Sequence, residues 1–149
     1  MRSEKAERLS RIVETQRDIA AAGFDLDSVM QLIVERSQAL TVAEGAIVSL
    51  LEDDDLVVGA ATGVAAHVVG TRRPLAESVV RYAFQAADTL LIEHAEGDAR
   101  LYSAFAQSVR DRSHICVPLL QADRPVGALN VMTTSEDAPR LGEDDRRTL

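Results

Sequence analysis

The apolar residues of this 149-residue chain change their spacing near residue 43, and that change limits the folds it can adopt. Before it, apolar residues recur at steps of three and four, which is the period of an α-helix. After it, short aliphatic and β-branched runs are separated by turn-forming residues, which is typical of strands. Further helical segments interrupt the strands. This order predicts an α+β domain built on an antiparallel sheet.

Two helices are expected before the change of period. The first covers residues 4–21, and its heptad-like stripe, which includes Leu9 and Val13, suits either a partner helix or packing on its own domain. The second begins after Asp25, a residue type that caps helices, and its apolar positions continue to Leu40. We expect residues 1–22 to act as a dimerisation helix.

Two hairpins are expected after the change of spacing near residue 43. One joins residues 45–52 to 56–63 through an acidic turn, and the other joins 113–120 to 125–133 through a short polar loop. The segments between the hairpins are expected as a strand over 66–74, a helix over 75–87, a strand over 89–93 and a helix over 98–107 capped by Asp98. An acidic first turn at 143–149 indicates the start of a connector helix to a further, effector domain.

Composition narrows the class of protein. A hydrophobic fraction of 46% with 27% charged residues is ordinary for one globular domain over 1–149. A net charge of −8 without a basic stripe disfavours nucleic acid. No apolar run has the length of a membrane helix, and the N-terminus lacks the apolar core of a signal peptide. With only one cysteine, no internal disulfide is available, so we expect a cytoplasmic protein.

Three motifs follow one another in the second half of the chain. Asp98 and Arg100 form D-x-R before a short helix, Arg112 begins R-S-x-x-x-V-P-L, and Gly127 begins G-x-L-N-V. In this order and spacing they resemble the second half of a GAF domain, and residues 25–54 resemble the first half more loosely.

The resemblance implies an architecture and a role. The architecture is an antiparallel sheet of five or six strands, with N- and C-terminal helices on one face and short helices and loops roofing a pocket on the other. The role is that of a sensory or dimerisation module in a bacterial signalling protein, placed before an effector such as a histidine kinase or a diguanylate cyclase. We expect a homodimer that binds a small molecule, and a purely structural dimerisation module is the alternative.

Strand alternation selects the candidate site. His114 and Cys116 share one face of their strand, and Asn130 and Met132 share one face of the next, while the aliphatic residues between them face the other way. If the roofed pocket exists, this mixed face is its floor. Three aromatic residues are candidates for its walls, namely Tyr82, Tyr102 and Phe105. The alternative is that all of these are core residues around an empty or water-filled hollow.

The sequence gives little support for catalysis, metal binding or a bound cofactor. No nucleophile and base stand in a catalytic pattern, so we expect no enzymatic activity. His67 and His94 lie on segments without the spacing of metal ligands. No cofactor is expected, although His114 leaves noncovalent haem open. Members of the resembled family that reduce free methionine sulfoxide use several cysteines, and the bilin-binding and cyclic-nucleotide patterns are absent here.

Arg72 and Arg73 precede Pro74 and the start of an expected helix. There they could reach an anionic ligand, although an exposed arginine pair is the more common outcome.

Overall fold

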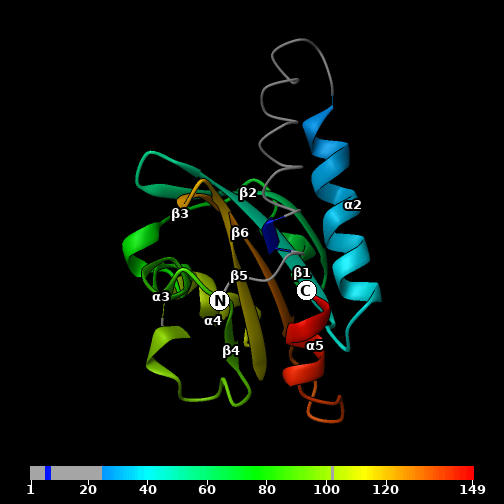
Figure 1. Ribbon diagram of the computed structural model, residues 1–149. Helices are drawn as coiled ribbons and strands as arrows, with labels where there is room; N and C mark the ends of the chain where they lie inside the picture. The colour runs from blue at the N-terminus through cyan, green and yellow to red at the C-terminus, as the bar shows by residue number, and fades with distance from the viewer. Residues whose placement is uncertain (1–5, 8–24, 102) are drawn as a thin grey trace.

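The computed structural model describes residues 6–7, 25–101 and 103–149 (Figure 1). Its strands are β1 (Gly45–Glu52), β2 (Asp55–Gly63), β3 (Arg72–Pro74), β4 (Leu90–Ile92), β5 (Ser113–Gln121) and β6 (Arg124–Thr133). Its helices are α2 (Leu26–Ala39), α3 (Val80–Ala86), α4 (Ala104–Val109) and α5 (Glu143–Thr148). Three short 3₁₀ helices are η1 (Ala66–Val68), η2 (Leu75–Glu77) and η3 (Ala99–Leu101).

The six strands form one antiparallel sheet in the order β3-β2-β1-β6-β5-β4. Both expected hairpins are present, as β1 with β2 and β5 with β6. The long strands β1 and β6 pair at the centre, and the three-residue strands β3 and β4 lie at the two edges. The predicted α+β fold with a sheet of five or six strands is therefore confirmed.

The two faces of the sheet carry different layers (Figure 1). On one face, Ile115, Val117 and Leu119 of β5 join a buried cluster with residues of α2 and with Leu141 and Leu149 beside α5. On the other face, residues of α3 and α4 cover the sheet in two smaller clusters. Alternation along each strand produces this division, because neighbouring side chains point to opposite faces.

The second predicted helix is confirmed as α2. The Asp25 carboxylate caps it by accepting a hydrogen bond from the backbone nitrogen of Ser28 at 3.3 Å. Its inward face buries Met30, Ile33 and Val34 against the sheet. The helix expected over 4–21 lies outside the described residues except for Ala6 and Glu7, which are helical, and Ala6 is buried in the same cluster.

The strand expected over 66–74 is shorter than predicted. Only Arg72–Pro74 pairs with β2, and Ala66–Val68 forms a 3₁₀ helix that buries Val68. Gly70 takes a positive φ of 82°, and its backbone nitrogen bonds to the Val58 carbonyl. This glycine turns the chain back toward β2, and pairing begins only after that turn.

Two expected helices are each divided by a serine. Ser78 is extended and its hydroxyl accepts from the backbone nitrogen of Val80, so residues 75–87 become η2 followed by α3. Ser103 is also extended and caps α4 through the nitrogen of Ala106, so the segment 98–107 becomes η3 followed by α4. Asp98 is therefore not the cap of α4; its carboxylate binds the backbone and guanidinium of Arg100.

The segment before α5 is tied to the strand β5 and the loop before it. The backbone nitrogen of Leu141 donates to the Ser113 hydroxyl at 2.9 Å. Arg140 donates to the carboxylate of Glu96 and to the backbone carbonyls of Glu93 and Arg112. The hydrogen bonds that the Glu96 carboxylate accepts from Arg140, together with the one it accepts from Arg112, lower the pKa of the Glu96 carboxyl far below its usual range.

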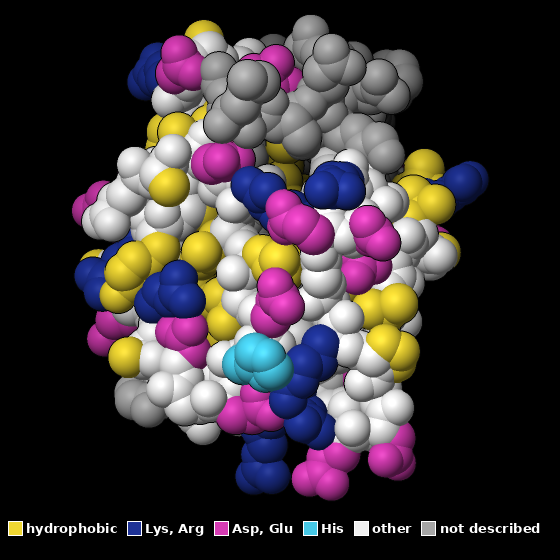
Figure 2. Space-filling view, turned by 60° about the horizontal axis from the view of Figure 1, so that its bottom comes forward, with side chains coloured by type: hydrophobic (Ala, Val, Ile, Leu, Met, Phe, Trp, Pro, Cys, Tyr) yellow, Lys and Arg dark blue, Asp and Glu magenta, His cyan; other side chains and the backbone are white. Residues whose placement is uncertain are grey.

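The outer surface is mixed in character. Figure 2 shows acidic and basic side chains interspersed on one face of the molecule, with scattered apolar side chains between them. Leu32 on α2 and Leu40 at its end are 52% and 63% exposed. Among the described residues, no helix combines the length and the apolarity that a bilayer crossing requires.

Candidate functional site

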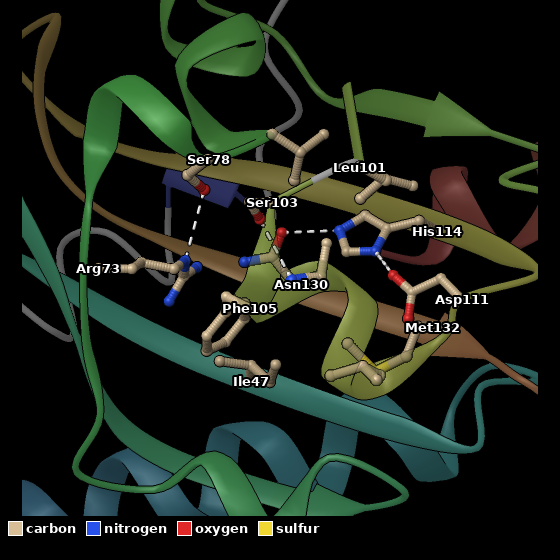
Figure 3. A pocket seen from close by; sticks show the side chains of 13 residues that line it. Ile47, Arg73, Ser78, Leu101, Ser103, Phe105, Asp111, His114, Asn130 and Met132 are labelled. Carbon is tan, nitrogen blue, oxygen red and sulfur yellow. Dashed lines mark hydrogen bonds and ion pairs between the residues drawn. The ribbon is translucent and has the colours of Figure 1, made fainter. Parts of the chain in front are cut away.

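A small cavity lies between the sheet and the α3–α4 layer (Figure 3). The volume in which the centre of a water molecule can lie is about 20 Å³. This is enough for roughly one or two waters. We call it the inner cavity. Its lining residues are Ile47, Arg73, His114, Asn130 and Met132 from the strands, and Ser78, Val79, Leu101, Ser103, Phe105, Ala106, Val109 and Asp111 from the covering segments.

Three polar residues form a chain of contacts along one wall of the inner cavity. The Nδ1 atom of His114 lies 2.5 Å from the Oδ2 atom of Asp111, and its Nε2 atom lies 2.9 Å from the Oδ1 atom of Asn130. The contacts with Asp111 on one side and Asn130 on the other hold the ring of His114 in a fixed orientation. The side chains of His114 and Asp111 are only 6% and 4% exposed.

Local structure brings this chain of contacts together. Arg110 ends α4 in the left-handed conformation with φ of 60°, which turns the chain sharply into β5. Asp111 thereby lies three residues before His114 and beside its ring. Asn130 lies opposite Cys116 in the β5–β6 register, two residue pairs along from His114 opposite Met132, so His114 and Asn130 meet diagonally on one face of the sheet.

Two atoms of this chain of contacts remain without a hydrogen-bond partner among the described residues. They are the Oδ1 atom of Asp111 and the Nδ2 atom of Asn130, and both are buried. A buried polar atom without a partner costs about 1–3 kcal/mol. A molecule in the inner cavity with matching donors and acceptors would recover that free energy.

Arg73 enters the inner cavity from the edge strand β3 and is 7% exposed. Its guanidinium donates to the hydroxyls of Ser49 at 3.2 Å and Ser78 at 3.5 Å, and it lies 4.0 Å from the centroid of the Phe105 ring. Burial lowers the pKa of Arg73 to about 10, which leaves the side chain charged near neutral pH. Its neighbour Arg72 points outward and pairs with Asp55 and Glu52.

Most of the residues expected at the pocket do meet there, but not all. His114, Asn130, Met132 and Phe105 line the inner cavity. Cys116 does not line it: this residue is fully buried below α3, and burial raises the pKa of its thiol to about 12. Tyr102 lies outside the described residues.

Tyr82 lines a second, larger hollow, which we call the outer cavity. This cavity offers about 340 Å³ and includes Arg81 and Arg100 beside Tyr82. Ser78 and Ser103 line both cavities, so the two are neighbours separated by these side chains.

Among the residues of the inner cavity that sequence reasoning did not name as pocket candidates are two charged ones, Asp111 and Arg73. Asp111 could not be placed because the left-handed turn at Arg110 has no signature in the residue types. For Arg73, the sequence did contain a signal, namely the arginine pair Arg72–Arg73 before Pro74. Contact of this pair with an anionic ligand was one of the two alternatives, and exposure to solvent was the other. In the strand β3, alternation makes the first arginine exposed and the second buried.

Comparison with known proteins adds independent information. The chain matches a family model described as a GAF domain over residues 25–149. No curated protein sequence matches it.

Several solved structures are similar to most or nearly all of the chain. The GAF domain of a phosphoenolpyruvate-protein phosphotransferase from Acinetobacter has a TM-score of 0.69 at 16% identity, over 98% of this chain and 86% of that one. A free methionine-R-sulfoxide reductase from Neisseria meningitidis, solved with its substrate, has a TM-score of 0.64 at 20% identity, over 99% and 85%. The second GAF domain of DevS from Mycobacterium smegmatis has a TM-score of 0.60 at 21% identity, over 79% and 80%. At these identities the similarity concerns the fold.

Proposed function

The chain belongs to the GAF domain family, and on that basis we propose that it is a regulatory domain that binds a small molecule in the inner cavity. One observation carries the proposal. Charged and polar side chains converge on a buried cavity, and part of their hydrogen-bonding capacity is unused by the described residues. A mostly apolar hollow with a few placed polar groups is the usual character of a small-molecule site.

The dimensions of the two cavities define what the ligand would look like. The inner cavity admits only a small chemical group, whereas the outer cavity beside it has the size of an ordinary ligand site. We therefore propose a ligand whose polar end fills the inner cavity. The rest of such a ligand would lie beneath α3 and η3, near Ser78 and Ser103.

In this proposal the domain regulates and does not catalyse. The only cysteine of the chain is fully buried with a raised pKa, so it offers no thiolate for attack. A ligand would act by binding two states of the protein with different affinity and so shifting their populations. The proposed readers of that shift are a second copy of the chain and an effector domain of a signalling protein.

A dimerisation module without a ligand is the second candidate function. The observation that favours it is the exposure of large apolar side chains at Leu32 and Leu40. Such residues would be covered in a pair of chains.

Native mass spectrometry of freshly purified protein tests both candidates. For a ligand-binding domain we expect a mass above that of the polypeptide, which disappears after denaturation. A matched pair of variants assigns it to the inner cavity. Ala106→Leu fills that cavity and should lose the extra mass, whereas Ser108→Leu, on the exposed side of α4, should retain it.

The same spectrum separates the alternatives. A dimer without any bound molecule, together with no thermal stabilisation by a panel of metabolites, would favour the pairing module. A bound molecule that survives unchanged in Ala106→Leu would place the site elsewhere and contradict the proposal.

A further inference from the structure

Arg73 is a buried cation for which the described residues supply no carboxylate. Within the part of the chain that the structure describes, no ion pair within 4.0 Å involves it, and the two hydrogen-bond partners found there are neutral serine hydroxyls. A buried arginine is ordinarily paired, because removing a charge from water is costly unless an opposite charge compensates for it. Its neighbour Cys116 does not compensate, since the raised pKa keeps that thiol neutral.

The carboxylate that lines the inner cavity is in contact with His114 and not with Arg73. Asp111 is the one carboxylate among the described lining residues, and it contacts the ring of His114. In Figure 3, Asp111 lies beyond His114, on the side of the cavity away from Arg73. Among the described residues, the guanidinium of Arg73 is thus left without a carboxylate in contact.

The guanidinium of Arg73 also has N–H donors that the described residues do not use. The Phe105 ring covers one of its faces, but its N–H groups lie in its plane and are not used by that contact. Ser49 and Ser78 accept only part of what the group can donate, and the Ser78 bond at 3.5 Å is long. An anion arriving in the plane of the guanidinium would take up these free donors.

Asn130 offers a further donor on the same side. Its Oδ1 atom is engaged by His114, which leaves the Nδ2 atom as a buried donor without a partner among the described residues. Figure 3 shows this nitrogen on the side of the amide that faces Arg73. With Oδ1 in contact with His114, the amide of Asn130 presents its Nδ2 atom toward Arg73.

We propose that the inner cavity binds the carboxylate of a small organic acid between the guanidinium of Arg73 and the amide nitrogen of Asn130. A planar carboxylate matches the fork of a guanidinium. The cavity is small, so it takes the carboxylate group itself; its walls at Ile47, Phe105 and Met132 suit the carbon next to that group, and the rest of the acid would lie toward the outer cavity. A tetrahedral phosphate would leave several oxygens against apolar walls. This inference rests on the proposed function, because it names the ligand class for the same cavity.

Thermal denaturation and calorimetric titration of dialysed protein test the inference. The probes are the sodium salts of propionate, pyruvate, phosphate and nitrate at matched ionic strength. We expect saturable stabilisation by a monocarboxylate and not by phosphate; nitrate, which is planar but has no apolar carbon to contact Ile47, Phe105 and Met132, should stabilise less than the monocarboxylate. Stabilisation by an inorganic anion alone would overturn the carboxylate assignment.

Three variants locate the binding. Arg73→Met should weaken binding about tenfold or more, since it removes a charged hydrogen bond. Arg73→Lys keeps the charge but loses the planar fork, so it should also bind more weakly than the wild type. Arg72→Met, one residue earlier on β3 and exposed, should bind as the wild type does.

The stability of the ligand-free variants gives a second readout. Arg73→Met should melt at the same temperature as the wild type or higher, because it removes an uncompensated buried charge. A much lower melting temperature, with unchanged binding in Arg73→Lys, would show a structural role for Arg73 and overturn the inference. Asn130→Asp, which is nearly the same size, should abolish binding by repelling the carboxylate; unchanged affinity would also contradict the assignment.

Failure of this inference can be told apart from failure of the proposed function. A wild-type protein that retains an uncharged molecule, and binds it equally well as Arg73→Met, would overturn the carboxylate inference and leave the binding function standing. A wild-type protein that binds no small molecule at all would overturn both.

Discussion

Burial decides the chemistry of the single cysteine. Cys116 lies on the same strand face as His114 but is covered by α3, where it packs with Val80, Ala83 and Ala128. Burial raises the pKa of its thiol to about 12, and the nearby charge of Arg73 offsets this only in part. The residue therefore behaves as a small apolar side chain, and the polar character of this face lies in His114 and Asn130.

Cys116 should react slowly with a thiol reagent in the native protein. The reagent needs an exposed thiolate, and the fold provides neither exposure nor ionisation. The measurement is the labelling rate in buffer compared with the rate in strong denaturant. Because the chain has one cysteine, the signal reports this site alone. Comparable rates would contradict the burial.

The same burial predicts a dependence of stability on pH. The thiol of an unfolded chain has an ordinary pKa of 9.0, whereas burial raises the pKa of the native thiol to about 12. The contribution of Cys116 to the free energy of unfolding is thus complete below pH 9 and is lost as the pH rises toward 12. The slope that the wild type shows in this window should be shallower in Cys116→Ala.

At the scale of secondary structure, the connections determine where elements begin and end. The β5–β6 hairpin turns at Ala122 and Asp123, with φ values of 49° and 67°. Positive φ at both positions suits a two-residue turn whose twist matches the strands. Alanine is an unfavourable residue there, because its Cβ crowds the backbone in the left-handed region.

Ala122→Gly should therefore stabilise the protein. Glycine takes positive φ without the steric cost, so we expect the free energy of unfolding to rise by about 1 kcal/mol. Urea denaturation measures it. Ala138→Gly, in the exposed loop before α5 and outside the positive-φ residues, is a control that should not gain stability. No gain in Ala122→Gly would contradict the strain assigned to this turn.

The long elements could be predicted from the sequence, and the short ones only in part. Alternation and a cap sufficed for α2, for both hairpins and for the opposite faces of Ile115 and His114, because many residues contribute to each pattern. Ser78 and Ser103 divide the expected helices through single side-chain bonds to the backbone, which compete with helix continuation. For the three-residue strand β3, the register that buries Arg73 depends on pairing with β2, which only the fold specifies.

At the scale of the whole molecule, β5 connects the inner cavity to the C-terminal helix. His114 faces the cavity, while the preceding Ser113 accepts from Leu141 on the opposite side of the sheet. Arg140, next to Leu141, holds the carbonyl of Arg112 and the carboxylate of Glu96. A displacement of β5 at the cavity would therefore be passed directly to the segment that leads into α5.

Arg140→Gln should loosen this connection without unfolding the sheet. It removes the charged bonds to Glu96 and weakens those to the carbonyls of Glu93 and Arg112. We expect faster hydrogen exchange at the amides of Ala95 and Leu141, with unchanged exchange in β1. Arg147→Gln, an exposed arginine paired only with an exposed aspartate among the described residues, is the matched control. Unchanged exchange at Leu141 in Arg140→Gln would contradict a role for Arg140 in holding this segment.

The alternation of β5 and β6 also has an evolutionary consequence. The even-numbered residues His114, Asn130 and Met132 face the inner cavity. The odd-numbered residues between them face the opposite side of the sheet and pack in the core beneath α2. Mutations at even positions can change what the cavity recognises while the odd positions go on maintaining the fold. Descendants of such a gene are therefore free to diverge in ligand while keeping the same architecture. An inserted or deleted codon within either strand would exchange the two sets at once and would be removed by selection.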